Sequence, residues 1–324
     1  MIDFLLKLLG DPNEKKVKKI LGIIDHINAL EPEFEKMSDE ELTKLETALK
    51  AKDENTITEI TMTHSNAERV KLREDYKAKF NRELLDDFDK YTKSDFKDTI
   101  ISMYKDPVEY DTDLLYKAMK GLGTDDDTLM EVISFRSLER LNQIKEKFKE
   151  KYGKELIPEI KSETSGEYQK CLIALFETER SKNKTPDLET CKKIAEELYK
   201  AGEGKIGTND SVFVKYFTSL SGEELALVGK EYHKNYKKTL VNVIDNEFGG
   251  DLNKLLKNIL YALISPSEYF ARRIKAAVKG AGTKDTQLIR SIVSRADEDM
   301  NMIKKYYQKL FEKNISVDIK GDTS

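Results

Sequence analysis

The sequence predicts an all-helical protein assembled from an internal repeat. Good helix formers, chiefly Lys, Glu, Leu and Ala, fill the chain of 324 residues, which contains only six prolines. Apolar residues return every three to four positions, which is the spacing of a buried helix face, and strand-like alternation between turns is missing. A similar glycine turn also occurs at three places, and each copy separates two helical segments.

The helix expected over residues 138–152 shows how the elements are recognised. Gly153 follows it, where a left-handed C-cap is expected. The helix that contains Leu129 should begin at Thr124, because Asp127 follows three residues later in a pattern that resembles a capping box. The buried face of the 138–152 helix is expected to consist of Leu138, Leu141, Ile144, Phe148 and Tyr152.

Composition and charge exclude several classes of protein. No stretch approaches 18 apolar residues, so no transmembrane helix is expected. The net charge of −4 gives no support for nucleic-acid binding. Cys171 and Cys191 are too few for a disulfide scaffold and fit a reducing, cytoplasmic location; Cys171 is expected in the core and Cys191 partly exposed. A net-negative chain should also be repelled by acidic membranes unless a cation intervenes.

The three glycine turns share a second feature. They lie at residues 120–124, 205–208 and 279–283, and each ends in a threonine. A carboxylate lies 39 positions after each threonine, at Glu163, Glu247 and Asp322. One glycine turn can be a simple helix break, and one acidic residue is usually a solvated surface group. Asp and Glu make up 60 of the 324 residues, so three coincidences at one spacing are improbable and favour a joint role.

Calcium chemistry explains this pairing. Ca²⁺ takes about six to eight oxygen ligands, including backbone carbonyls, a bidentate carboxylate and water. A glycine turn can direct its carbonyls inward because glycine tolerates positive φ. A loop that returns about 40 residues later can add the carboxylate. Such a shell leaves positions open for water or for a lipid phosphate oxygen.

The paired motifs resemble the annexin repeat, Gly-x-Gly-Thr followed after 38 residues by Asp or Glu. The resemblance implies four repeats of five helices in a curved disc, whose convex face binds acidic phospholipid through Ca²⁺. We divide the chain into a helical leader at 1–37 and repeats at 38–106, 107–180, 186–265 and 266–324. The protein is therefore expected in the cytoplasm and peripherally on membranes when calcium rises.

The resemblance also implies ligands, position by position. In the second repeat they are the carbonyls of Met119, Gly121 and Gly123 with the Glu163 side chain. In the third they are the carbonyls of Gly202, Lys205 and Gly207 with Glu247, in a longer turn that resembles the family's third-repeat variant. In the fourth they are the carbonyls of Val278, Gly280 and Gly282 with Asp322.

The first repeat departs from the pattern. Residues 50–54 read Lys-Ala-Lys-Asp-Glu where the glycine turn should lie, and Tyr91 occupies the carboxylate position. Both halves of the site are missing together, so no Ca²⁺ of this type is expected there. Lys50 and Lys52 could contact lipid phosphate directly, or they could simply be solvated.

The two ends of the chain depart as well. The fourth repeat lacks the closing helix that residues 167–176 supply in the second, and residues 2–10 are one candidate to fill that groove. Residues 4–45 locally resemble the N-terminal segment of the SecA translocation ATPase, but no Walker A motif follows. The leader is read either as an ordinary amphipathic helix or as a helix that touches the membrane.

Two other functions compete with this interpretation. An enzyme is not expected, because the three histidines are scattered and show no metal-ligand spacing. A calcium-independent helical scaffold that binds cytoskeletal or other proteins, or its own copies, remains the alternative. The turn tips Leu122, Ile206 and Ala281 are candidate membrane contacts, and local packing of Ile206 is the competing interpretation.

Overall fold

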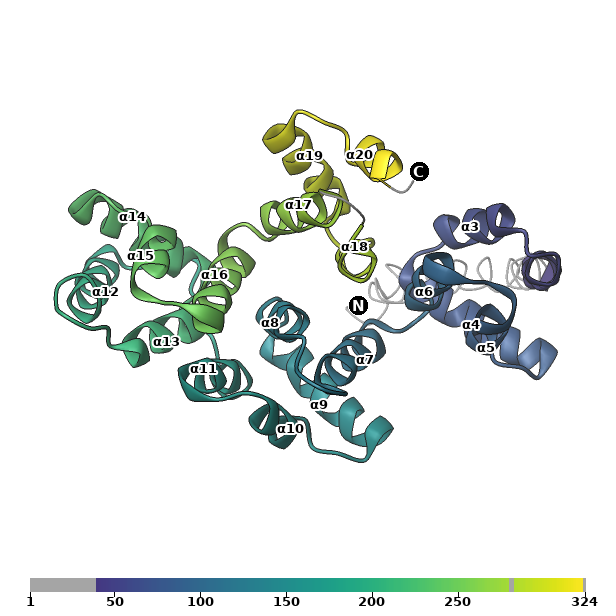
Figure 1. Ribbon diagram of the computed structural model, residues 1–324, viewed down its shortest axis with the longest axis horizontal. Helices are drawn as coiled ribbons and strands as arrows, with labels where there is room; N and C mark the ends of the chain where they lie inside the picture. Colours follow the sequence, from purple (N-terminus) through teal and green to yellow (C-terminus); the bar gives the residue numbers. More distant parts are fainter. Residues whose placement is uncertain (1–38, 280–282, 323–324) are drawn as a thin grey trace, which may run out of the picture. The chain divides into compact units, whose positions relative to one another are not determined.

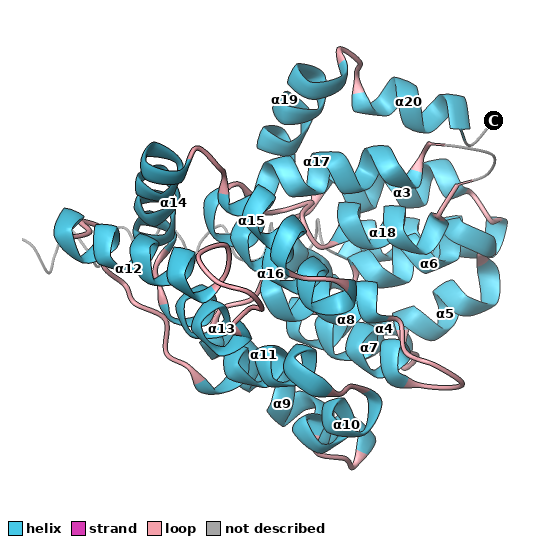
Figure 2. Ribbon diagram, turned by 60° about the vertical axis from the view of Figure 1, so that its left-hand side comes forward, coloured by secondary structure: helices cyan, strands magenta, loops and turns pink. Residues whose placement is uncertain are grey.

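The computed structural model describes residues 39–279 and 283–322, with side chains up to residue 321. The expected leader at 1–37 lies outside the described residues. Every regular element in the described part is a helix, which confirms the all-helical prediction (Figure 2). The chain divides into two compact units, one ending at Tyr104 and one starting at Lys105, and each is described separately.

The first unit contains five described helices. A helix over residues 39–51 leads into α3 (Glu54–Thr63), with only Lys52 and Asp53 between them. Asp53 caps α3 by accepting a hydrogen bond from the Thr56 amide at 3.2 Å. The core contains Leu45, Leu49, Ile57, Tyr76, Phe88 and Tyr104. The remaining helices are α4 (Asn66–Phe80), α5 (Leu84–Tyr91) and α6 (Ser94–Met103).

The second unit repeats this helix order, coloured from teal through green to yellow in Figure 1. One group of five is α7 (Pro107–Met119), α8 (Asp126–Ser134), α9 (Leu138–Tyr152), α10 (Leu156–Glu163) and α11 (Gly166–Glu177). The next is α12 (Leu188–Ala201), α13 (Asp210–Ser219), α14 (Gly222–Tyr236), α15 (Leu240–Glu247) and α16 (Gly250–Ile264). The last group has four described helices, α17 (Pro266–Ala277), α18 (Asp285–Val293), α19 (Met300–Phe311) and α20 (Ile315–Asp322).

One of the two predicted helix ends agrees with the structure, and the other does not. Helix α9 ends as expected at Gly153, which has a left-handed φ of 66°. The prediction that Thr124 opens α8 is wrong. Asp125 is the N-cap, and it accepts a hydrogen bond from the Thr128 amide at 3.0 Å. The Thr124 hydroxyl is thereby left for another partner.

Helices α7 to α16 share one apolar core. Helix α8 packs against α16, and α11 packs against α13, so the two five-helix groups interlock. Both cysteines are buried in this core, so the expected partial exposure of Cys191 is wrong. Helices α17 to α20 have a second core around Phe270, Ile274, Ile303 and Tyr307.

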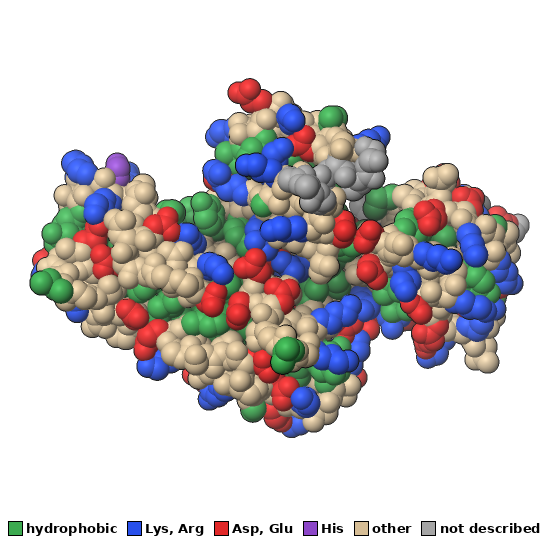
Figure 3. Space-filling model, viewed as in Figure 1, with side chains coloured by type: hydrophobic (Ala, Val, Ile, Leu, Met, Phe, Trp, Pro, Cys, Tyr) green, Lys and Arg blue, Asp and Glu red, His purple; other side chains and the backbone are tan. Residues whose placement is uncertain are grey.

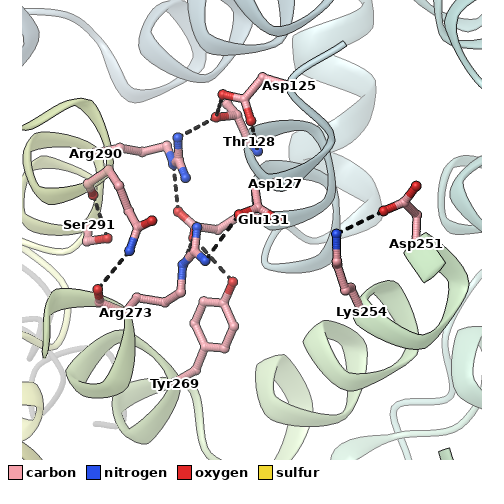
Figure 4. A network of polar contacts seen from close by, with 11 residues as sticks. Asp125, Asp127, Thr128, Glu131, Asp251, Lys254, Tyr269, Arg273, Arg290 and Ser291 are labelled. Atoms are coloured by element: carbon pink, nitrogen blue, oxygen red, sulfur yellow. Dashed lines mark hydrogen bonds and ion pairs between the residues drawn. The ribbon is translucent and has the colours of Figure 1, made fainter. Parts of the chain in front are cut away.

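A buried ionic cluster connects the last helix group to α8 (Figure 4). Glu131 of α8 is 3% exposed and lies between two arginines. Arg290 of α18 donates to its Oε1 at 2.8 Å, and Arg273 of α17 donates to its Oε2 at 3.0 Å. Tyr269 adds a hydroxyl donor at 3.2 Å, and Arg290 also donates to Thr128. Arg273 also lies 3.5 Å from the Asp127 carboxylate, so two carboxylates compensate the two arginines and make their burial tolerable.

The carboxylate of Asp318 fixes α20 against α17 and α19. The Lys275 ammonium at 2.5 Å, the Tyr307 hydroxyl at 2.7 Å and Lys313 lower the pKa of Asp318 to about 2. A depressed carboxylate pKa stabilises the fold above the unfolded pKa, and this contribution disappears as the pH falls through the folded pKa. Asp318→Asn should therefore cost about 1–2 kcal/mol of unfolding free energy at pH 7.

Urea denaturation of the native protein and the Asp318→Asn variant at several pH values measures this loss of unfolding free energy. The difference between them should shrink as the pH falls from about 4 towards about 2. A difference that stays the same at every pH would show that lost packing, and not the charge of Asp318, causes the destabilisation.

Candidate metal centre

The second helix group brings the predicted pair together. The turn between α7 and α8 ends at Thr124, and α10 ends at Glu163. The Thr124 hydroxyl donates to Glu163 Oε2 at 2.9 Å, across 39 residues of sequence. Gly121 and Gly123 have φ values of 117° and 88°, which glycine adopts without strain. The turn residues and the carboxylate therefore form one local site.

The carbonyls of this turn are free for a ligand. Within the described part of the chain, those of Met119, Gly121 and Gly123 accept no hydrogen bond. Gly121, Gly123 and Glu163 are exposed, so water or an ion can reach them. A carboxylate with several carbonyl oxygens is the donor set that Ca²⁺ prefers. The residues present therefore fit the ion that the sequence implies.

The third helix group holds the equivalent pair more tightly. The Thr208 hydroxyl donates to Glu247 Oε2 at 2.6 Å, and Glu247 is half-buried. A Cβ added to Gly202 would lie 3.2 Å from the carboxyl carbon of Glu247, so a side chain there would crowd the carboxylate. The carbonyls of Lys205 and Gly207 accept no hydrogen bond in the described structure, whereas that of Gly202 accepts one from the Lys205 amide at 3.0 Å.

Glu203 lies inside this turn and is not among the residues predicted for the site. The Tyr232 hydroxyl donates to it at 3.0 Å, Asn246 donates at 3.3 Å, and Lys238 pairs with it. Burial raises the pKa of Glu203, but these partners outweigh burial and leave the pKa below its usual value. An acidic residue within a glycine turn was the available signal, because the other two turns have none between the last helix residue and the threonine.

An acidic hollow of about 440 Å³ lies beside the second pair. Burial raises the pKa of Asp126, and the Asp251 carboxylate adds to the rise against a hydrogen bond from Tyr168. Burial likewise raises the pKa of Asp210, and Glu167 adds to it. Crowded carboxylates of this kind favour nearby cations. Its lining includes Glu163 of the second pair with Asp126, Glu167, Asp210, Gly249 and Asp251, of which Asp210, Gly249 and Asp251 belong to the third helix group.

The turn tips are apolar and exposed. Leu122 and Ile206 are the most exposed large hydrophobic residues of the described chain. Local packing of Ile206, the competing interpretation, is therefore wrong. On the face of residues 105–324 drawn in Figure 3, acidic and basic side chains are interspersed, without one dominant basic area. A protruding leucine or isoleucine is costly in water and favourable at a membrane interface.

The fourth site is described in part. Val278 is the C-cap of α17, and the Lys284 amide closes the turn by donating to the Ala277 carbonyl at 2.9 Å. Asp125 and Asn209 make the equivalent bonds in the other turns, at 2.8 Å and 2.7 Å. The remaining proposed residues, Gly280, Ala281, Gly282 and the Asp322 side chain, lie outside the described structure.

The first helix group lacks both halves of the arrangement. Its turn consists of Lys52 and Asp53, and Asp53 is committed to capping α3. Lys50 pairs with Glu46 at 2.6 Å, and the Lys90 ammonium lies 4.7 Å from the ring centroid of Tyr91. No cluster of three or more His, Cys, Asp or Glu side chains suited to a metal occurs among the residues described. Metal binding would therefore depend on carbonyls with one carboxylate per site.

A family model described as Annexin matches four stretches of the chain, at residues 26–103, 110–175, 193–259 and 269–324. The chain belongs to the annexin family. Annexins are known for calcium-dependent phospholipid binding. The chain is 36% identical to annexin A7 of Dictyostelium discoideum over 80% of its own length and 56% of that protein. It is 35% identical to annexin A1 isoform p37 of Columba livia, over 90% of its own length and 86% of that protein.

Solved annexin structures have the same fold. Annexin III superposes with a TM-score of 0.85 at 30% identity, covering 89% of this chain and 90% of that one. Calcium-bound annexin (Sm)1 superposes with a TM-score of 0.78 at 26% identity, covering 89% and 86%. The names of these relatives describe annexins and not enzymes. In the described part of this annexin, each helix is too short or too polar to cross a bilayer.

Gly207→Ala tests whether the backbone of the third annexin turn matters for the ion. Gly207 has a φ of 80°, and a side chain at this angle costs about 1–2 kcal/mol. The variant should raise the Ca²⁺ concentration needed for half-maximal vesicle binding by about fivefold or more. Gly153→Ala is the matched control, because Gly153 also has a positive φ, 66°, and open space around its Cα, but lies in the connection between α9 and α10. Equal behaviour of the two variants would contradict a role for the Gly207 conformation.

Proposed function

We propose that this annexin binds acidic phospholipid membranes through Ca²⁺ held at the paired turns. The second site would use the carbonyls of Met119, Gly121 and Gly123 with Glu163. The third would use the carbonyls of Gly202, Lys205 and Gly207 with Glu247. The fourth would use Val278, Gly280, Gly282 and Asp322 in the same roles. The observation that carries the proposal is the contact of each turn threonine with its distant glutamate, at 2.9 Å and 2.6 Å.

The bound ion would supply positive charge between two negative partners. Glu163 and Glu247 neutralise part of its charge, and the remaining coordination positions can accept phosphate oxygens of the lipid. Because a lipid phosphate would enter the coordination shell of the bound ion, bound lipid raises the affinity of the protein for Ca²⁺, and bound Ca²⁺ raises its affinity for the lipid. Ca²⁺ affinity should therefore be weak in solution and higher with acidic vesicles.

The relative placement of the two sites supports joint binding. Glu163 lines a hollow together with Asp210 and Gly249, which lie two positions after Thr208 and Glu247, so the second pair is close to the loops of the third. Two weak contacts on one rigid unit give a higher apparent affinity than either contact alone. Leu122 and Ile206 protrude from the same two turns and would enter the lipid interface. We also propose that the protein is cytoplasmic and binds peripherally to membranes when the Ca²⁺ concentration rises.

The division into repeats at 38–106, 107–180, 186–265 and 266–324 belongs to this proposal. In it the first repeat contributes no ion of this type, because its two-residue turn has no free glycine carbonyls and Tyr91 has no carboxylate. The first repeat would then serve membrane binding through other contacts or none.

Cosedimentation with vesicles tests the proposal. Vesicles of phosphatidylserine and phosphatidylcholine should sediment the protein with Ca²⁺ and release it when a chelator is added. Vesicles of phosphatidylcholine alone should sediment much less protein. Binding that ignores the chelator would contradict the calcium bridge and favour the alternative of a calcium-independent scaffold for cytoskeletal or other protein partners.

A further inference from the structure

The carboxylate of Glu203 connects the third turn to two neighbouring helices. It accepts hydrogen bonds from Tyr232 of α14 at 3.0 Å and from Asn246 of α15 at 3.3 Å. Lys238, in the connection between α14 and α15, forms an ion pair with it. The Glu203 side chain is 11% exposed, whereas its partner Lys238 is 45% exposed, so the carboxylate is buried more deeply than the ammonium that pairs with it. Asn246 directly precedes Glu247, so Glu203 reaches the segment that presents the site's carboxylate.

The backbone of the third turn is also held by its own hydrogen bonds. The Gly204 amide donates to the Tyr199 carbonyl at 2.7 Å, and the Lys205 amide donates to the Gly202 carbonyl at 3.0 Å. The turn therefore has internal contacts as well as the external contact through Glu203.

The second turn lacks these contacts. In the described structure, the amides and carbonyls of Gly121, Leu122 and Gly123 form no hydrogen bond. Its connections are the Thr124–Glu163 hydrogen bond and backbone bonds at its two ends, from the Lys120 amide to the Lys117 carbonyl and from the Asp125 amide to the Ala118 carbonyl. One chain thus contains a tethered turn and an untethered turn with the same threonine–glutamate pair.

Tethering changes affinity because an untethered loop loses conformational freedom when it closes on a ligand. A site that is already held in place loses less, so it binds at lower ligand concentration. We propose that Glu203 is a positioning residue that holds the third turn in its binding arrangement, so that the third site takes Ca²⁺ before the second. This inference rests on the proposed calcium function and adds an order of filling to it.

Single-tryptophan reporters can follow each turn separately. The chain has no tryptophan, and Leu122 and Ile206 are fully exposed tips, so substitution there should leave the cores intact. The third-turn reporter combines Ile206→Trp with Glu163→Gln, and the second-turn reporter combines Leu122→Trp with Glu247→Gln. Each chain then reports one of the two sites. Fluorescence is titrated with Ca²⁺ in the presence of phosphatidylserine vesicles, and the third-turn midpoint should be lower by about threefold or more.

Glu203→Gln is then added to both reporters. The third-turn midpoint should rise by about threefold or more, because the ion pair with Lys238 is lost, while the second-turn midpoint should stay within about twofold. Lys238→Gln should shift the third turn in the same direction. Glu196→Gln is the control for charge, because Glu196 is an exposed partner of Lys200 on α12 in the same helix group. Thermal unfolding midpoints of all variants should agree, which separates positioning from general destabilisation.

The outcomes distinguish a failure of the proposed calcium function from a failure of the positioning role of Glu203. If neither reporter responds to Ca²⁺, the proposed function fails. If both respond but Glu203→Gln leaves the third turn unchanged, or shifts both turns equally, the positioning role of Glu203 is overturned while the calcium sites stand. A second-turn midpoint equal to or below the third would overturn the order of filling.

Discussion

Replacing both Glu163 and Glu247 by glutamine should raise the Ca²⁺ concentration for half-maximal binding to acidic vesicles by at least about 100-fold. Loss of a direct or supporting ligand group typically lowers metal affinity by about 10- to 100-fold per site, and two sites contribute here. Glutamine keeps an oxygen that can accept the Thr124 and Thr208 hydrogen bonds, so the turns should persist. Each single variant should show a smaller shift. Vesicle cosedimentation over a calcium series measures the midpoints.

A matched control separates ligand loss from loss of negative charge. Glu189 is an exposed residue in the first turn of α12 and pairs with Lys192, away from both turns. Glu189→Gln removes the same charge and should leave the calcium midpoint unchanged. A double variant that binds vesicles like the native protein would refute the assignment of Glu163 and Glu247 as ligands.

Glu131→Gln should cause the largest loss of stability. The substitution leaves Arg290 and Arg273 beside a neutral amide, in a place where Glu131 and Arg290 are 3% exposed. Breaking one side of a buried ion pair costs about 3–5 kcal/mol, because the remaining charge stays desolvated and unpaired. For a unit of this size the melting temperature should fall by roughly 10 °C. Calorimetry or thermal circular dichroism measures it.

The control for this prediction is an exposed ion pair. Glu179 and Lys182 form one with side chains that are 75% and 85% exposed. Glu179→Gln should change stability by less than about 0.5 kcal/mol. If Glu131→Gln were equally mild, the cluster in Figure 4 would not hold the last helix group to α8.

Local signals made the helices and the paired sites predictable. Apolar spacing identified α9, and Gly153 marked its end. The 39-residue spacing placed Thr124 with Glu163 and Thr208 with Glu247, and the structure brings each pair into contact. These features depend on short-range periodicity or on a repeated interval, and both are visible in one sequence.

Features that depend on long-range packing were not predictable. Glu131 and Arg290 are 159 residues apart, and nothing in a chain with 60 acidic and 56 basic residues marks them as partners. Thr124 was predicted to cap α8, but Asp125 is the N-cap, and the Thr124 hydroxyl donates to Glu163 instead. The role of Glu203 likewise depends on its contacts with Tyr232 and Lys238, which are distant in the sequence and lie beside it only in the folded chain.

A crystal structure of the protein grown or soaked with Ca²⁺ tests the central claim most directly. The account predicts an ion at the second turn coordinated by Glu163, and one at the third turn coordinated by Glu247. Each ion should also be bound by the carbonyls of its turn, and no such ion should lie beside Tyr91. Empty turns at millimolar Ca²⁺, or ions bound elsewhere with Glu163 and Glu247 uninvolved, would contradict it.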